Sequence, residues 1–110
     1  MTFEEAVDYA VSLGGVERST HYGDPAAKAN GHAILSPGRE PGSFCLMIGQ
    51  DIKLMLIETD PGTFWQTPHY EGWPGVLVRY DTRDPERVRA LIGQARDRAL
   101  AKKPPRPRKA

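Results

Sequence analysis

The sequence predicts an α+β fold of one domain, in which an antiparallel β-sheet combines with an N-terminal, a central and a C-terminal helix. Three observations carry this prediction. Apolar residues recur at helical spacing near both ends of the chain. The pair Asn30-Gly31 separates two short runs, which indicates a tight hairpin. A length of 110 residues suits one domain with a small core.

The composition is that of an ordinary soluble globular protein. No apolar run approaches the ~20 residues that span a bilayer. The acids Glu4, Glu5 and Asp8 do not fit a secretory signal peptide, which begins with basic and then apolar residues. The single Cys45 rules out an internal disulfide and lies in an apolar run. We therefore expect a cytoplasmic protein that does not enter the membrane, with a buried, inert thiol.

The first helix is predicted over residues 3–13. Thr2 and Glu5 form a T-x-x-E capping box, and an amphipathic pattern follows it. Gly14-Gly15 ends the helix, because glycine readily takes the left-handed conformation at a helix end. Residues 16–25 are interpreted as a connector with some strand character around residues 19–22.

A β-meander is predicted next. The Asn30-Gly31 turn joins a strand near residues 26–29 to one near residues 32–36, since both turn residues tolerate the positive φ of a type I′ turn. Residues 37–43 form a polar loop rich in proline and glycine. Residues 44–48 are the third strand.

Residues 50–59 fit two interpretations. Alternate apolar positions are compatible with a strand, whereas the composition in leucine, methionine, lysine and glutamate favours a helix. We interpret the segment as a helix. Asp60-Pro61 then resembles the N-cap and first residue of a short helical turn. A loop over residues 65–74 and a strand over residues 75–80 follow.

The last helix is predicted from Asp84-Pro85 to about Ala101. Its apolar residues lie within a narrow arc, flanked by Arg87 and Arg98 on one side and by Arg89 and Arg96 on the other. Residues 102–110 follow it as a flexible, basic, proline-rich tail, because Pro104-Pro105 cannot continue a helix.

Charge is distributed unevenly along the chain. Residues 1–78 hold four basic and ten acidic side chains, a net charge of −6, whereas residues 79–110 hold eleven and four, a net charge of +7. The C-terminal third therefore offers a surface for a polyanion. The alternative is a solvated helix face followed by a tail that improves solubility.

Residues 65–74 form an aromatic loop that holds both tryptophans. Such a loop is either a structural plug or a recognition surface. His69 could act as a general base, but no nucleophile is paired with it by spacing. The three histidines lack the spacing of a helical zinc motif. We therefore predict neither catalytic residues nor a metal site, and expect a protein without cofactor that is not an enzyme.

Several of these segments together resemble the MmcQ/YjbR family. The matching pieces are THYGDPAAK at residues 20–28, NG at 30–31, DP at 60–61 with Phe64, TPHYEG at 67–72 and VLVR at 76–79. The resemblance extends from the first helix to about Leu100. Two departures, Ala27 and Gly75, put small residues where the family commonly has larger ones.

The resemblance implies a two-layer domain with helices on one face of an antiparallel sheet, and DNA binding in which hairpins act as paired wings. We then expect weak, sequence-independent contacts to phosphates. The predicted nucleic-acid contacts are Lys28, Arg39, Arg79, Arg83, Arg87, Arg89, Arg96, Arg98, Lys102, Lys103, Arg106, Arg108 and Lys109.

A second hypothesis is that the protein binds a small molecule or a peptide. An aromatic pocket with a few polar groups is the usual form of a ligand site. The residues predicted to line it are Tyr22, Trp65, Thr67, His69, Tyr70 and Trp73. Under the first hypothesis Trp73 stacks instead on an unpaired base. Under either hypothesis we expect a monomer.

Overall fold

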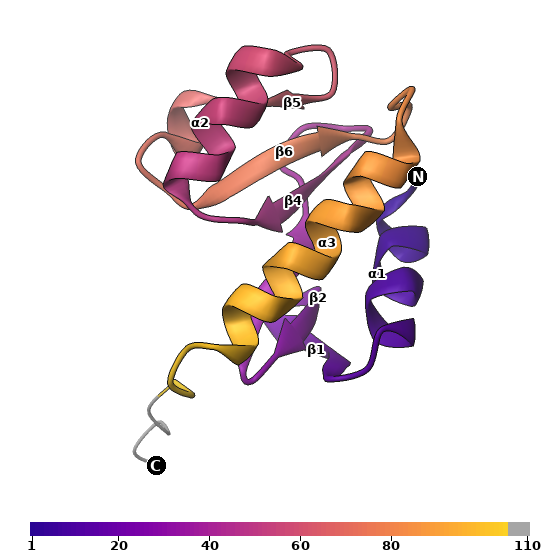
Figure 1. Ribbon diagram of the computed structural model, residues 1–110, viewed down its shortest axis with the longest axis vertical. Helices are drawn as coiled ribbons and strands as arrows, with labels where there is room; N and C mark the ends of the chain where they lie inside the picture. The colour runs from indigo at the N-terminus through magenta and orange to yellow at the C-terminus, as the bar shows by residue number, and fades with distance from the viewer. Residues whose placement is uncertain (106–110) are drawn as a thin grey trace.

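The computed structural model describes residues 1–105. Within this range, three α-helices, one 3-10 helix and six strands confirm the predicted α+β class (Figure 1). In chain order the elements are α1 (Phe3–Ser12), β1 (Val16–His21), β2 (Asp24–Ala29), β3 (His32–Pro37), β4 (Ser43–Met47), α2 (Gln50–Thr59), β5 (Phe64–Trp65), the 3-10 helix η1 (Pro68–Tyr70), β6 (Gly75–Arg79) and α3 (Pro85–Leu100).

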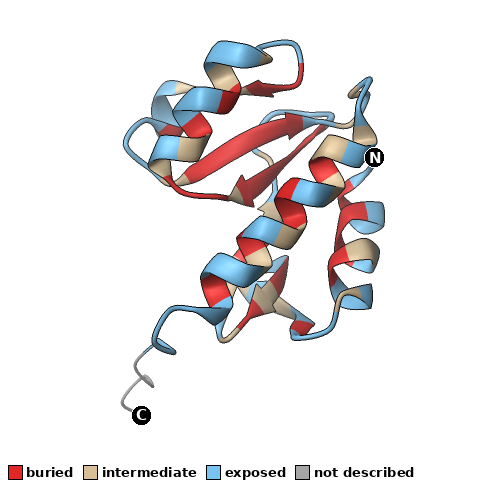
Figure 2. Ribbon diagram, in the orientation of Figure 1, coloured by how far each residue is buried: buried red, intermediate tan, exposed pale blue. Residues whose placement is uncertain are grey.

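The strands form one antiparallel sheet in the order β1-β2-β3-β4-β6-β5. α1 and α3 pack side by side over β1, β2, β3 and β4, while α2 packs on β5 and β6. Side chains from all three helices join the same apolar core on the sheet. The central strands β4 and β6 are buried along almost their whole length (Figure 2).

The predicted helix starts are confirmed. The Thr2 amide donates to Glu5 Oε1 at 2.9 Å, and the Glu5 amide donates to Thr2 Oγ1 at 3.2 Å, which completes the capping box. Asp84 Oδ1 accepts from the Arg87 amide at 3.1 Å at the start of α3. The ambiguous segment over residues 50–59 is the helix α2.

The interpretation of residues 16–25 as a connector is wrong. They contain all of β1 and the start of β2, which pair over six residues each and meet in a turn at Tyr22-Gly23. Both turn residues have positive φ, +52° at Tyr22 and +83° at Gly23. Tyrosine is not a typical residue for that conformation, so the sequence carried no recognisable hairpin signal here.

The prediction for residues 60–65 also needs correction. Asp60-Pro61 begins a single turn, in which the Asp60 carbonyl accepts from the Thr63 and Phe64 amides at 3.1 and 3.0 Å, but the strand that follows this turn was not predicted. Phe64 and Trp65 then form β5, which pairs with β6. A two-residue strand exists only through this pairing, and no local pattern encodes it.

The Asn30-Gly31 hairpin is confirmed, and it holds the end of α3. Asn30 Nδ2 donates to the carbonyls of Ala99 and Lys102 at 3.2 and 2.6 Å. A Cβ atom at Gly31 would lie 2.9 Å from Pro105 Cδ. The first residues of the basic tail therefore lie against this hairpin, while residues 106–110 are outside the described part.

Replacing Gly31 with valine should lower the free energy of unfolding by more than ~1 kcal/mol, because a β-branched residue is strained at positive φ. The φ angle at Gly31 is +77°. Gly31→Asn is the control and should lose less, since asparagine tolerates this conformation. Urea unfolding measures both variants. An unchanged midpoint for the valine variant would contradict the strain at this turn.

Candidate functional site

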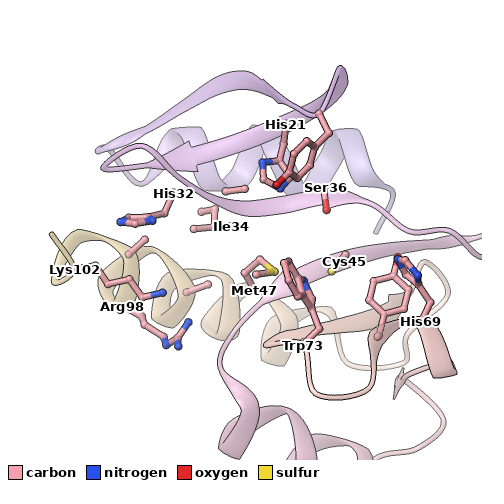
Figure 3. A pocket seen from close by; sticks show the side chains of 15 residues that line it. His21, His32, Ile34, Ser36, Cys45, Met47, His69, Trp73, Arg98 and Lys102 are labelled. Atoms are coloured by element: carbon pink, nitrogen blue, oxygen red, sulfur yellow. The ribbon is translucent and has the colours of Figure 1, made fainter. Parts of the chain in front are cut away.

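A groove of about 480 Å³ opens between the two halves of the sheet. β3 pairs with β4 only over residues 35–37, so its first residues are separated from β4. The groove is lined by these residues, the tip of the β1–β2 hairpin, β4, the segment around η1 and the last turns of α3 (Figure 3). It thus collects side chains from five parts of the chain.

Two aromatic side chains on the rim are largely exposed. Tyr22, at the tip of the β1–β2 hairpin, is 84% exposed, and Trp73, after η1, is 49% exposed. The Tyr22 ring lies 4.4 Å from the ring of His21, at a tilt of 59°. Trp73 is therefore not a buried plug, and both rings are accessible for contact with a ligand.

Lys53 holds the Trp73 side of the rim in place. Its side chain is fully buried, and Nζ donates to the carbonyls of Tyr70 and Trp73, both at 2.6 Å. Burial lowers the pKa of Lys53, while Cys45 and Glu71 act in the opposite direction. The Tyr70 hydroxyl accepts from the Arg39 amide at 3.2 Å. The loop that carries Trp73 is thus fixed through its main chain, and the indole ring is left exposed.

Gly75 allows close packing beneath the rim. A Cβ atom at this position would lie 2.6 Å from Cys45 Sγ, 3.0 Å from Met47 Sδ and 3.1 Å from Trp73 Cδ1. These three side chains fill the space that a larger residue would need. All three line the groove, so Gly75 determines the shape of one groove wall.

The Cys45 thiol lies buried in that wall. Burial raises the pKa of Cys45 to about 11, and a hydrogen bond with Ser36 partly offsets the effect. A thiol with this pKa is protonated at neutral pH and is a poor nucleophile. The predicted burial of the cysteine is confirmed, and its low reactivity stays a prediction.

Stability should fall as pH rises from about 9 to about 11, because the folded protein keeps the Cys45 proton that the unfolded chain loses near its ordinary pKa. Below that window this contribution does not change with pH. Lys53 and Tyr70 lie close to Cys45 and also change charge with pH. The measurement therefore compares the wild type with Cys45→Ala by urea unfolding across the window, so that their contributions are present in both proteins. The difference between the two proteins should change with pH. A constant difference would contradict the raised pKa.

Three of the arginines on α3 make contacts within the protein. Arg96 Nε donates to the Gly14 carbonyl at 2.7 Å. Arg87 lies 3.9 Å from Asp60 and stacks 5.7 Å from the centre of the Phe64 ring. Arg89 pairs with Glu86 and lies over the ring of Tyr9. These side chains cover the edge of the core, as their flanking positions predicted.

The predicted nucleic-acid contacts lie at several places in the structure. Arg98 and Lys102 line the groove, while Lys28 lies in a separate hollow beside Gly15. Arg79 stacks on Trp65 at 4.0 Å. Arg39, Arg83 and Lys103 are exposed. The predicted contacts Arg106, Arg108 and Lys109 lie outside the described residues.

The groove includes four of the six side chains predicted for a ligand pocket, namely Tyr22, His69, Tyr70 and Trp73. The other two do not line this groove. Trp65 belongs to β5 and lies under Arg79, and Thr67 is the N-cap residue of η1.

Sequence reasoning missed most of the groove's remaining lining, which is His21, His32, Ala33, Ile34, Ser36, Cys45, Met47, Ala95 and Ala99. These residues lie on strands and a helix that are far apart in sequence. Only the position of His21 beside Tyr22 could have pointed to one of them.

Comparisons with known proteins give relatives but no function. The chain is 32% identical over 75 residues to "Uncharacterized protein Rv2570" of Mycobacterium tuberculosis and to "Uncharacterized protein Mb2600" of Mycobacterium bovis. Each match covers 64% of this chain and 58% of the relative, so the chain matches less than two thirds of these relatives' length. No protein-family model and no solved structure matches.

Residues 1–105 lack two kinds of feature. No helix in this range is long and apolar enough to cross a membrane. No group of three or more His, Cys, Asp or Glu side chains in the same range is placed to hold a metal ion.

Proposed function

We propose that this domain is a binding module that takes a small ligand in the groove between Tyr22 and Trp73. The groove lies within the ~300–1,000 Å³ that is usual for ligand sites. It combines an apolar wall with a few polar groups and two accessible aromatic rings. The protonated Cys45 thiol argues for binding without covalent catalysis.

The observation that carries this proposal is Tyr22. A bulky residue at positive φ is strained, and an 84% exposed side chain gains little from packing. Asparagine or glycine would suit this turn position better. A tyrosine that costs stability at the rim of a groove is readily explained if it contacts a ligand.

The first test separates binding from stability at Tyr22. Tyr22→Asn should raise the free energy of unfolding by about 0.5–1 kcal/mol, because the strain is relieved. The same variant should weaken binding to groove ligands. Loss of stability in Tyr22→Asn would show that the tyrosine is structural and would remove the main support for the proposal.

The ligands for that test come from a library of small aromatic compounds screened by amide chemical shifts in NMR spectra. Compounds should shift the amides of groove residues. Ala33→Trp should abolish the shifts, because Ala33 lines the groove and a large ring there fills it. Ala90→Trp, on the exposed face of α3, is the matched control and should keep them. The proposal fails if no compound shifts the groove, or if the shifts survive in Ala33→Trp.

A second candidate function is weak binding of DNA through phosphate contacts. The observation that favours it is the group of Arg98, Lys102 and Lys103, which are exposed side chains at the end of α3. Replacing Arg98 and Lys102 with glutamine should reduce the salt dependence of duplex binding by about two phosphate contacts. Replacing Arg87 and Arg89 should change it less, because they contact Asp60 and Glu86. No duplex binding at low salt would exclude this function.

Membership of the MmcQ/YjbR family and a cytoplasmic location belong to the same proposal. The first is supported by the motif run from residue 20 to residue 79, and the second by the single cysteine.

A further inference from the structure

The groove has a strongly one-sided charge. Arg98 and Lys102 line it together with three histidines, and no aspartate or glutamate is among its lining residues. The whole chain nevertheless contains 14 acidic side chains against 15 basic ones. A groove that excludes carboxylates and gathers cations favours an anionic occupant.

The two cations of the groove are available to such an occupant. Arg98 and Lys102 take part in none of the ion pairs found within residues 1–105. A Cβ atom at Gly49 would lie 3.2 Å from Arg98 Cζ, so the absence of a side chain at Gly49 lets the guanidinium lie there. An arginine fork binds carboxylate and phosphate groups in a bidentate geometry.

The neighbouring part of the groove offers a surface for a flat ring. Figure 3 shows Arg98, Lys102 and His32 toward one end of the groove, and Trp73, Cys45 and His69 toward the other. The main chain at Trp73 is held by Lys53, and its amide donates to the Tyr70 carbonyl at 3.0 Å. An exposed indole ring carried on a fixed main chain is well suited to stack on an aromatic ligand.

We infer that the ligand of this groove is a small aromatic acid, with its ring against Trp73 and its anionic group on Arg98 and Lys102. This inference rests on the proposed binding function and adds the chemical class of the ligand. The anionic group is a carboxylate or a phosphate, because both present oxygen pairs that an arginine and a lysine can bind.

The test uses two pairs of probes that differ in charge, indole-3-acetate with indole-3-acetamide, and adenosine monophosphate with adenosine. Calorimetry and the amide shifts of groove residues measure their binding to the full chain. In at least one pair the acid should bind about tenfold more tightly than its neutral partner, the effect of one charge-assisted contact. The pair that shows the preference identifies the anionic group.

Charge variants connect that preference to the groove. Replacing Arg98 and Lys102 with glutamine should abolish the preference for the acid and leave the neutral partner's affinity unchanged. Arg89→Gln, on the same helix but paired with Glu86, is the control and should keep the preference. Loss of Arg98 could by itself disturb the packing at Gly49, so Lys102→Gln is also measured alone. This single variant should reduce the preference for the acid in part.

The outcomes distinguish this inference from the proposed function. Equal affinity for acid and neutral partner in both pairs, or a preference that survives in the double variant, overturns the inference and leaves groove binding in place. If none of the four probes binds, the inference is also overturned, and the library screen with Ala33→Trp decides separately on the proposed function.

Discussion

Replacing Phe64 with alanine should lower the free energy of unfolding by about 3–5 kcal/mol, the usual cost of deleting a buried large aromatic side chain. Phe64 is fully buried and belongs to the main core. It pairs with Val78 of β6, and Arg87 covers its ring. Removing the ring therefore leaves a cavity between the sheet and the helices. Denaturant unfolding monitored by circular dichroism measures the loss.

Two variants make the Phe64 result specific. Phe64→Leu keeps most of the volume and should cost less than about 1.5 kcal/mol. Trp65→Ala removes a half-buried neighbour on the other side of β5 and should cost less than Phe64→Ala. A loss below about 1 kcal/mol for Phe64→Ala would mean that residues 64–65 are a surface loop and that β5 does not form part of the core.

Gly75→Ala should lower the free energy of unfolding by about 1–3 kcal/mol, the cost of overpacking. The added methyl group would lie 2.6 Å from Cys45 Sγ, at the first residue of β6, where Gly75 pairs with Met47 of β4. Gly→Ala substitutions stabilise only where the backbone φ suits alanine and the new methyl group has free space. Gly93→Ala in α3, with nothing within 4 Å of the new Cβ, should stabilise by about 1 kcal/mol and is the matched control.

Cys45→Ala should partly rescue Gly75→Ala, because it removes the nearest atom to the new methyl group. The double variant should be more stable than the sum of the single effects predicts, with a coupling of about 0.5–3 kcal/mol. Additive effects would show that the clash lies elsewhere, with Met47 or Trp73. Because Trp73 lies 3.1 Å from the same position, Gly75→Ala should also weaken ligand binding at the groove.

The sequence predicted the helices and one hairpin because their signals are local. A capping box at Thr2 and an N-cap at Asp84 satisfy amide groups within one turn, so nearby residues suffice to define them. Asn30-Gly31 defines its turn through the φ angles of two residues. The helical interpretation of residues 50–59 relied on propensity, and its bounds agree with α2.

Elements that depend on long-range pairing escaped prediction. β5 forms because Phe64 and Trp65 pair with residues of β6 that lie more than ten positions later in the chain. The β1–β2 hairpin was not predicted because Tyr22 occupies a turn position with positive φ, where asparagine or glycine is normally found. These two misses are the strands at the two opposite edges of one sheet, where pairing with a distant or poorly signalled partner defines the strand and no local pattern describes it.

The sequence alone determined the α+β class, the main helices, the buried thiol and the aromatic residues from which a site could be built. Only the tertiary structure decided which of them share a groove. It put Trp65 under Arg79 and outside the groove lining, and it placed Arg98 and Lys102 on the groove wall. The physical reason is that side-chain surroundings depend on packing between distant segments, whereas helices and turns depend on residues only a few positions apart.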